Sequence, residues 1–260
     1  KVWNTLAHLG DRGMLVTRTD PDVPKHRGLT YFALDMHAPG VDVRPLRQIT
    51  GEAEFNEVYL TDVRIPDSDR IGDVGDGWRV SMTTLMNERV TIGGGGGGAP
   101  SGGPKRGSGA IAEAVDLWHR REQHDAATLD ELMKLWIDEE VLRLTNMRAS
   151  AAAKSGNPGP EGSISKLALA LNQQRIYALC MNLLGADALA GFDYTFRRPE
   201  EISLTAALGE ARHMFLRSRA NSIEGGTSEI MRNILGERVL GLPGEPRVDK
   251  ELPWSKVPRS

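Results

Sequence analysis

The sequence has little cysteine, no long apolar run and no excess of one charge. Its single cysteine, Cys180, has no partner for an internal disulfide bond, and its apolar neighbours indicate a small buried side chain. A reducing, cytoplasmic environment is therefore favoured. No run reaches the roughly 18 apolar residues of a membrane span, and the N-terminus lacks the apolar core of a signal peptide. We expect a cytosolic globular protein.

The charge balance and the histidines exclude further classes of protein. The 32 basic and 35 acidic residues leave a net charge of −3, with no basic block that would follow a nucleic-acid backbone. The six histidines show no His-x-x-x-His spacing, and no Gly-x-Ser-x-Gly turn is present. Neither a zinc enzyme nor a serine hydrolase is indicated. The chain starts with Lys1 rather than Met, so we expect residues upstream of it.

The first part of the sequence has the pattern of strands and turns. Short β-branched and aromatic runs alternate with Pro, Gly and Asp from Gly13 to about Ile71. An antiparallel sheet or small barrel is predicted here. The expected strands are Met14 to Arg18, Leu29 to Asp35, Val41 to Leu46 and Glu54 to Leu60.

The rest of the sequence is predominantly helical. Helical spacing begins at Val80 to Thr91, and further helices are predicted at about 163–184, 202–219 and 227–240. A long helix before them carries apolar residues at intervals of three and four, which predicts one buried stripe. The stripe consists of Leu129, Met133, Ile137, Val141 and Leu144.

These patterns predict an α+β fold, with an antiparallel β domain followed by a helical bundle. We expect an N-terminally incomplete β domain at 1–72, a four-helix-bundle domain at 73–245 and an extended tail at 246–260. The bundle domain contains a glycine-rich loop at 93–109, with six consecutive glycines at 93–98. This loop is either a flexible linker or a glycine surface for close helix packing.

The first of three segments with functional content is the N-terminal Lys1-Val2-Trp3-Asn4-Thr5. Alternation along a strand would place Trp3 and Thr5 on one face. Taken alone, a tryptophan such as Trp3 is more often an ordinary packed aromatic residue than the wall of a cofactor site.

The second segment runs from Phe55 through Ile65-Pro66 and Gly77-Trp78 into a helix that contains Asn87-Glu88-Arg89. Without further context, Glu88 and Arg89 are a solvated pair on a helix surface.

The third segment is Ile223-Glu224-Gly225-Gly226-Thr227-Ser228-Glu229-Ile230-Met231-Arg232-Asn233. Two glycines let backbone N–H groups approach a ligand, and a helix N-terminus favours negative charge. The alternative is a plain turn followed by an N-cap.

Together, the three segments resemble the acyl-CoA dehydrogenase family over nearly the whole chain. The resemblance implies an α+β fold of that type and binding of FAD, with Trp3, Thr5, Thr227 and Glu229 at the flavin. It also places Arg89 and Glu224 at the substrate, and it makes the amide of Gly225 a donor to the thioester oxygen.

Two departures from the family pattern affect the catalytic assignment. One branch has its catalytic glutamate directly before the Gly-Thr of the third segment, where this chain has Gly225, and Glu224 stands one residue too early. Another branch has a glutamate directly before an arginine on the helix after the β domain, a position that Glu88 matches. The usual Arg-x-x-Phe-Gly segment is replaced by 118–124, where Arg120 or Arg121 is the candidate phosphate partner.

The resemblance implies α,β-dehydrogenation of an acyl-CoA thioester, in which Glu88 removes the α proton and the β hydride passes to flavin N5. An electron-transfer flavoprotein would accept the electrons, and the assembly would be a homo- or hetero-oligomer, either a dimer or a tetramer. The alternative is a non-catalytic subunit of a heteromeric dehydrogenase of steroid side-chain degradation. A third interpretation is an acyl-binding module without a redox role.

Overall fold

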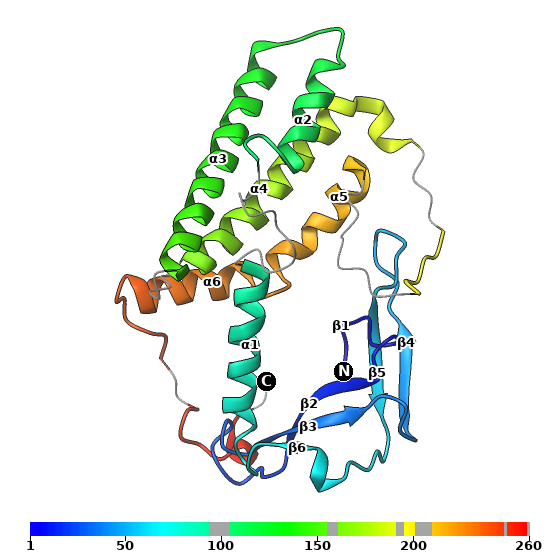
Figure 1. Cartoon of the computed structure of the whole chain (residues 1–260), viewed down its shortest axis with the longest axis vertical. Coiled ribbons are helices and arrows are strands. Elements are labelled where there is room, and N and C mark those ends of the chain that lie inside the picture. Colours follow the sequence, from blue (N-terminus) through cyan, green and yellow to red (C-terminus); the bar gives the residue numbers. More distant parts are fainter. Residues whose placement is uncertain (94–104, 155–160, 191–194, 201–209, 247–248, 259–260) are drawn as a thin grey trace. The chain divides into compact units, whose positions relative to one another are not determined.

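The computed structural model describes residues 1–93, 105–154, 161–190, 195–200, 210–246 and 249–258, with the side chains of 86–93, 153–154 and 161–162 left out (Figure 1). The chain forms two compact units. The β unit contains Lys1–Glu88, Thr195–Ser203 and Glu245–Ser260, and the helical unit contains Arg89–Tyr194 and Leu204–Gly244. The domain boundaries given above stay predictions.

The β unit contains two antiparallel sheets of three strands each, in the orders β1-β5-β4 and β2-β3-β6. Val43 lies opposite Val58 in the first sheet and Leu15 opposite Phe32 in the second. The predicted strands are confirmed to within two residues at each end. The strands are β1 Asn4–Thr5, β2 Arg12–Arg18, β3 Leu29–Asp35, β4 Val41–Pro45, β5 Phe55–Leu60 and β6 Arg70–Ile71.

Helix α1, Gly77–Gly93, begins close to the backbone of β3. A Cβ atom at Gly77 would lie 2.7 Å from the carbonyl carbon of Thr30, so only glycine permits this approach. The short 3₁₀ turn η1, Asp67–Asp69, precedes β6 and α1. The helix predicted from Val80 to Thr91 is confirmed.

Two segments far along the chain complete the β unit. The N–H of Ala53 donates to the carbonyl of Arg197 at 2.8 Å, and Arg198 Nη2 donates to Oδ1 of the buried Asn56 at 2.9 Å. The C-terminal segment contains the 3₁₀ turn η5, Trp254–Lys256, and the guanidinium of Arg18 lies 4.1 Å from the centre of the Trp254 ring. The tail is therefore anchored on the β unit and is not extended throughout.

The helical unit is organised around α4, Glu161–Leu184, which contacts α2, α3, α5 and α6. The helix predicted at about 163–184 is confirmed, and Gly185, at φ 58°, directly follows its last residue, in the left-handed conformation common at helix ends. Residues 202–209 of the predicted third helix lie outside the described residues. The other elements are α2 Ala110–His119, α3 Ala126–Lys154, η2 Gly185–Leu189, α5 Ala211–Arg217, η3 Ser218–Ser222, α6 Ser228–Ile234 and η4 Leu235–Val239.

The core of this unit lies where α2, α3 and α4 meet. Ile111 and Ala114 from α2, Leu135 from α3, and Ile176 and Leu179 from α4 are all at most 1% exposed. No described helix has both the length and the apolar character that a membrane span requires. Residues 94–104 of the predicted glycine-rich loop lie outside the part of the chain that the structure describes.

The prediction of one buried stripe on α3 is wrong. Leu129, Met133, Ile137, Val141 and Leu144 are between 42% and 56% exposed. The face that packs against the bundle contains Leu132, Leu135 and Leu142, which are at most 6% exposed. Because both faces of α3 are apolar at helical spacing, periodicity alone could not decide which of them is buried.

Replacing Leu135 by Ala tests the position of this core. Leu135 is 0% exposed. The change should lower the free energy of unfolding by about 2–5 kcal/mol, because it removes buried methyl groups and leaves a cavity. Leu189→Ala is the control, since Leu189 is 91% exposed, and it should change the value by less than about 0.5 kcal/mol. Urea denaturation gives both values, and equal losses would contradict the assignment.

Candidate functional site

The turn at residues 223–227 has a backbone shape that requires glycine. Gly225 and Gly226 have φ values of 62° and 99°, in the left-handed region that other residues rarely adopt. A Cβ atom at Gly226 would also lie 2.6 Å from Cε of Met231, whose side chain is 2% exposed. The two glycines therefore allow a tight turn of the backbone. Neither residue has a side chain that would shield the backbone N–H groups of the turn.

Thr227 is the N-cap of α6. Its hydroxyl accepts a hydrogen bond from the N–H of Ile230 at 3.2 Å. Glu229 lies in the first turn of α6, where its carboxylate pairs with Arg232 at 3.3 Å. The N-cap interpretation of this segment is confirmed, and contacts of Thr227 and Glu229 with a flavin stay predictions.

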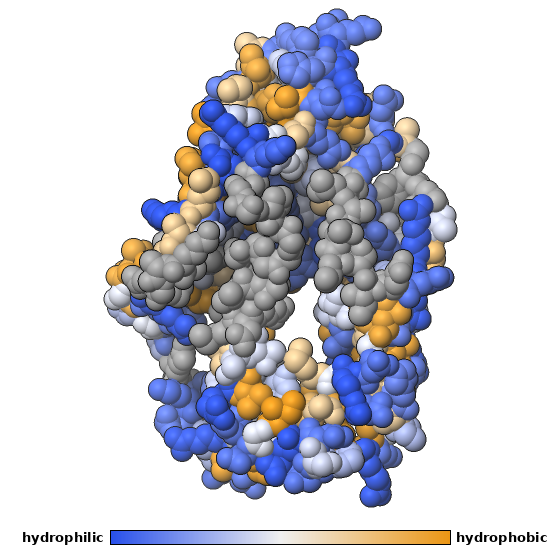
Figure 2. All heavy atoms as spheres, viewed as in Figure 1, coloured by the Kyte–Doolittle hydropathy of each residue, from blue (hydrophilic) through white to orange (hydrophobic). Residues whose placement is uncertain are grey.

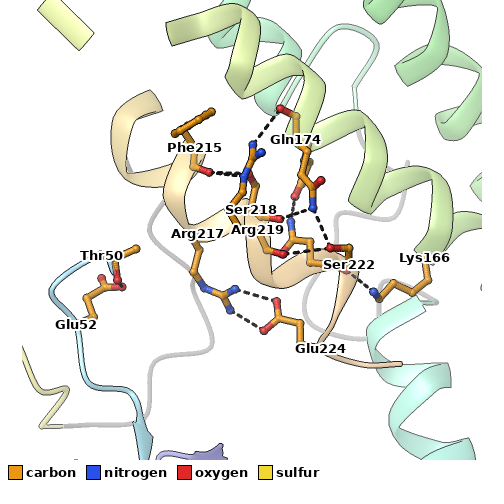
Figure 3. A network of polar contacts seen from close by, with 12 residues as sticks. Thr50, Glu52, Lys166, Gln174, Phe215, Arg217, Ser218, Arg219, Ser222 and Glu224 are labelled. Atoms are coloured by element: carbon orange, nitrogen blue, oxygen red, sulfur yellow. Dashed lines mark hydrogen bonds and ion pairs between the residues drawn. The ribbon is translucent and has the colours of Figure 1, made fainter. Parts of the chain in front are cut away.

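Polar side chains of α4 hold the segment that leads into this turn (Figure 3). Lys166 Nζ donates to the carbonyl of Asn221, and Gln174 Nε2 donates to the carbonyl of Ser218 at 3.1 Å. Asn221 Nδ2 donates to Gln173 Oε1 at 2.5 Å. Since these three side chains project from one rigid helix, they fix the position of η3 and of the turn after it.

Glu224 forms a bidentate ion pair with Arg217 in the same network of polar contacts (Figure 3). The Arg217 Nη1 and Nη2 atoms donate to the two carboxylate oxygens at 2.9 and 3.1 Å. Burial lowers the pKa of the nearby Lys166, and the negative charge of Glu224 partly opposes that shift. The Glu224 carboxylate therefore acts as a structural anion that positions the turn.

Trp3 and Thr5 belong to the β unit. The regular strand β1 covers only Asn4–Thr5, and Trp3 precedes it with φ 64°. The alternation predicted for Trp3 and Thr5 therefore does not apply. Trp3 is 62% exposed and meets Phe55 edge to face at 5.7 Å between ring centres. Most of the indole surface of Trp3 is thus exposed to solvent.

Thr5 is exposed and lines a cleft of about 460 Å³ within the β unit. Residues of both sheets form the walls of this cleft, among them Leu15 and Val58. A mainly apolar cleft with a hydroxyl at its edge is a suitable environment for one side of a planar ring.

Glu88 and Arg89 lie in α1, in the turn before the helix ends at Gly93. Their side chains are outside the described residues. The orientation of Glu88 stays a prediction.

Arg120 and Arg121 follow the C-terminal end of α2. Arg120 forms an ion pair with Asp116 one helical turn earlier. Arg121 contributes to the lowered pKa of Asp125, a shift that comes mainly from the Thr128 N–H at 2.8 Å. Arg120 is thus paired with an acidic residue of its own helix, and a phosphate role for either arginine stays a prediction.

Sequence reasoning did not identify Lys166, Gln173, Gln174 or Arg217 as part of the site. A signal was present in α4, because Lys166 and Gln173 are seven residues apart and so lie on one face of the helix. Only the apolar positions of this helix were used for the prediction.

Comparison with known proteins establishes the family. The model for the acyl-CoA dehydrogenase C-terminal domain matches residues 75–240, which are more than half of the chain. The chain belongs to the acyl-CoA dehydrogenase family. Acyl-CoA dehydrogenase FadE34 of Mycobacterium tuberculosis is 36% identical over 246 residues, covering 94% of this chain and 30% of that protein.

Solved structures show the same fold. The Tcur3481-Tcur3483 steroid ACAD is similar with a TM-score of 0.74 and 23% identity, covering 94% of this chain and 60% of that one. The ChsE4-ChsE5 complex from Mycobacterium tuberculosis is similar with a TM-score of 0.70 and 23% identity, with the same coverage of 94% and 60%. This chain therefore spans less than two thirds of each of these proteins, and the predicted α+β fold is confirmed.

Replacing Gly226 by Ala tests the shape of the turn. The left-handed backbone should cost about 1–2 kcal/mol in a residue with a side chain, and the new methyl group would also overlap Met231. The free energy of unfolding should fall by more than this backbone strain alone.

Gly241→Ala is the matched control for that change. Gly241 also has a positive φ, of 66°, but nothing lies within 4 Å of a Cβ atom placed there. This variant should show the backbone strain only. Equal destabilisation of the two variants, measured by urea denaturation, would mean that the contact between Gly226 and Met231 does not shape the turn.

Proposed function

We propose that the chain acts as an FAD-dependent acyl-CoA dehydrogenase that forms a double bond between the α and β carbons of an acyl-CoA thioester. The observation that carries this proposal is the glycine turn at 225–226. It lies between η3, which α4 holds through hydrogen bonds, and Thr227, the N-cap of α6. A turn with preorganised amides suits a site where negative charge develops on a carbonyl oxygen.

The residues described in each unit are compatible with a flavin. Trp3 presents an exposed indole face, Thr5 presents a hydroxyl at the edge of a cleft, and Thr227 and Glu229 lie at the start of α6. We propose Trp3 and Thr5 of the β unit as contacts of FAD and, separately, Thr227 and Glu229 of the helical unit. When bound, FAD would supply the two-electron acceptor that amino acid side chains do not provide.

Glu88 is the proposed base for the α proton, and the N–H of Gly225 is the proposed donor to the thioester oxygen. A carboxylate removes a proton from carbon only if the developing enolate is stabilised, so the two groups are needed together. Because both Glu224 oxygens are engaged by Arg217, the turn itself does not offer a free carboxylate in this position. Arg89 and Glu224 then serve substrate binding and the shape of the turn.

We further propose that a carrier flavoprotein of the electron-transfer type receives the electrons and that the protein works in the cytoplasm. The lone cysteine, Cys180, is buried, as expected for a chain that does not rely on disulfide bonds.

Glu88→Gln tests the base. The change keeps the size and polarity of the side chain but removes its basicity, so dehydrogenation should fall by about 10²- to 10⁴-fold. The protein should still fold and retain its yellow colour. Reduction of an artificial electron acceptor with acyl-CoA measures the rate, and the visible spectrum measures bound flavin.

Glu131→Gln is the matched control, since Glu131 is an exposed helical carboxylate on α3. This variant should keep the rate of the unmodified protein. Turnover of the Glu88→Gln variant near that rate would exclude Glu88 as the base.

A second candidate function is a non-catalytic subunit of a heteromeric dehydrogenase. Two observations favour it, namely the similarity to the ChsE4-ChsE5 complex and the absence of the Arg-x-x-Phe-Gly segment at 118–124. In this case the partner subunit would complete the flavin site.

Flavin retention distinguishes the two candidates. If the chain is catalytic by itself, it should be purified with about one FAD per chain, and substrate should bleach the flavin under anaerobic conditions. If it is a partner subunit, the isolated chain should be colourless, and co-expression with a related dehydrogenase chain should restore the flavin spectrum. A colourless chain in both preparations would contradict both functions.

A further inference from the structure

The segment around β1 has a backbone shape that is unfavourable by itself. Trp3, directly before β1, has φ 64°, and Leu6, directly after it, has φ 49°. Neither residue is glycine, and both lie in the left-handed region, where the backbone crowds a side chain. Such a conformation persists only if the surrounding structure holds it, and strain of this kind is common at functional sites. The presentation of Trp3 and Thr5 therefore depends on what holds β1.

Strand β5 and its neighbouring residues hold the two ends of this segment. The N–H of Val58 donates to the carbonyl of Lys1 at 2.7 Å. At the other end, the N–H of Leu6 donates to the carbonyl of Glu54, also at 2.7 Å. Asn4 lies between these two contacts and directly opposite Asn56. The middle of the segment is thus placed against the side of β5 that carries Asn56.

Asn56 is a polar side chain inside the β unit. It is 0% exposed, although the side of Figure 2 where Figure 1 shows β4 and β5 carries mostly hydrophilic side chains at its surface. Its Nδ2 donates to the carbonyl of Asn4 at 3.2 Å and to the carbonyl of Glu54 at 3.0 Å. Both N–H donors of the amide are therefore used. One of them holds the peptide group that joins Asn4 to Thr5.

Arg198 fixes the orientation of the Asn56 amide from a distant part of the chain. Its Nη2 donates to Oδ1 of Asn56 at 2.9 Å, across 142 positions of sequence. Because a cation requires an oxygen acceptor, the amide cannot exchange its oxygen and nitrogen by rotation. Nδ2 must then face the carbonyl of Asn4.

Backbone contacts on both sides of Arg198 fix its own position. The N–H of Ala53 donates to the carbonyl of Arg197 at 2.8 Å, and Nε2 of His8 donates to the carbonyl of Pro199 at 2.7 Å. His8 follows β1 by three residues. The segment that carries Arg198 is therefore attached to the same stretch of chain whose shape it controls.

We propose that Asn56 and Arg198 are positioning residues that hold β1 in its strained shape and so present Trp3 and Thr5 to the flavin. Arg198 orients the buried amide, and the amide fixes the peptide group before Thr5. A planar ring needs an aromatic face and a hydroxyl that are already in place, because ordering them on binding would lower the affinity. The ligand in this inference rests on the proposed function, whereas the positioning of β1 is measurable without flavin.

Hydrogen exchange of the full chain, followed by mass spectrometry, tests the positioning. In Arg198→Ala, the backbone amides of residues 4–8 should exchange at least about 10-fold faster, while those of β2 and β3 keep their rates. Arg198→Lys retains a cationic donor and should reverse most of this acceleration. Arg64→Ala removes an exposed arginine of the same unit and should change nothing. Unchanged exchange at 4–8, or equal acceleration in β2 and β3, would overturn the proposal.

Asn56→Asp tests the link between Arg198 and β1. A carboxylate at this position can still pair with Arg198, but it cannot donate to the carbonyl of Asn4. Exchange at residues 4–8 should therefore accelerate as in Arg198→Ala, in a protein whose circular dichroism shows that it folds. If it does not fold, the two Arg198 variants decide the question. Full protection of residues 4–8 in a folded Asn56→Asp protein would contradict the role of the amide.

Titration of the flavin-free chain with FAD, followed by the visible spectrum of the flavin, tests the purpose of the positioning. Arg198→Ala should raise the Kd about 10-fold, the effect expected from one lost charged hydrogen bond. Arg198→Lys should recover most of the affinity, and Arg64→Ala should keep it. An unchanged Kd together with faster exchange at 4–8 would overturn the link to the flavin. If the unmodified chain binds no FAD, the proposed function fails, and the exchange rates still decide whether Arg198 positions β1.

Discussion

The hydrogen bonds between α4 and residues 218–222 are the constraint on which the proposed site depends. One face of α4 forms the core through Ile176 and Leu179, and another face holds η3 through Lys166, Gln173 and Gln174. The packing of the core therefore sets the position of the polar side chains, and these set the backbone that enters the glycine turn. A site that stabilises developing charge must be rigid before the substrate arrives, because reorganisation would offset the stabilisation. Helix α4 and the glycine turn meet this need for rigidity, because hydrogen bonds connect the helix to the segment that enters the turn.

Burial also decides which titratable groups of the helical unit take part in chemistry. Desolvation raises the pKa of Cys180 to about 12 and that of Tyr177 to about 12, so both side chains stay protonated and serve packing. Desolvation likewise raises the pKa values of Glu113 and Glu139. A carboxyl group with a raised pKa in the folded state opposes folding once it ionises, so these two groups reduce stability as the pH rises through and above the usual carboxyl range. Hydrogen bonds from the backbone of Ala211 to Glu113 and from the side chain of Asn172 to Glu139 partly oppose these upward pKa shifts.

The sequence predicted the elements well and their burial less well. Strand bounds agree with the structure because Pro, Gly and Asp mark the turns of the β unit, and α4 ends at Gly185 as expected for a left-handed residue. The prediction of which face of α3 is buried was wrong, because its two apolar faces have the same periodicity. Only the helices packed against α3 determine which of the two faces is buried. The anchoring role of Gln173 and Asn221 could not be predicted, since their contact joins residues 48 positions apart. Long-range polar contacts depend on the tertiary structure, which periodicity does not encode.

The pairing of Arg217 with Glu224 connects the structure of the turn to the choice of base. A glutamate next to the glycines would be the obvious proton acceptor if its carboxylate were available. In this chain both carboxylate oxygens of Glu224 accept hydrogen bonds from the guanidinium of Arg217. Protonating the carboxylate would break this bidentate ion pair. In the proposed reaction, the turn would therefore supply amide donors, and a different carboxylate would serve as the base. The need for another carboxylate supports Glu88 as the proposed base. This support is independent of the position of Glu88 before an arginine in the sequence.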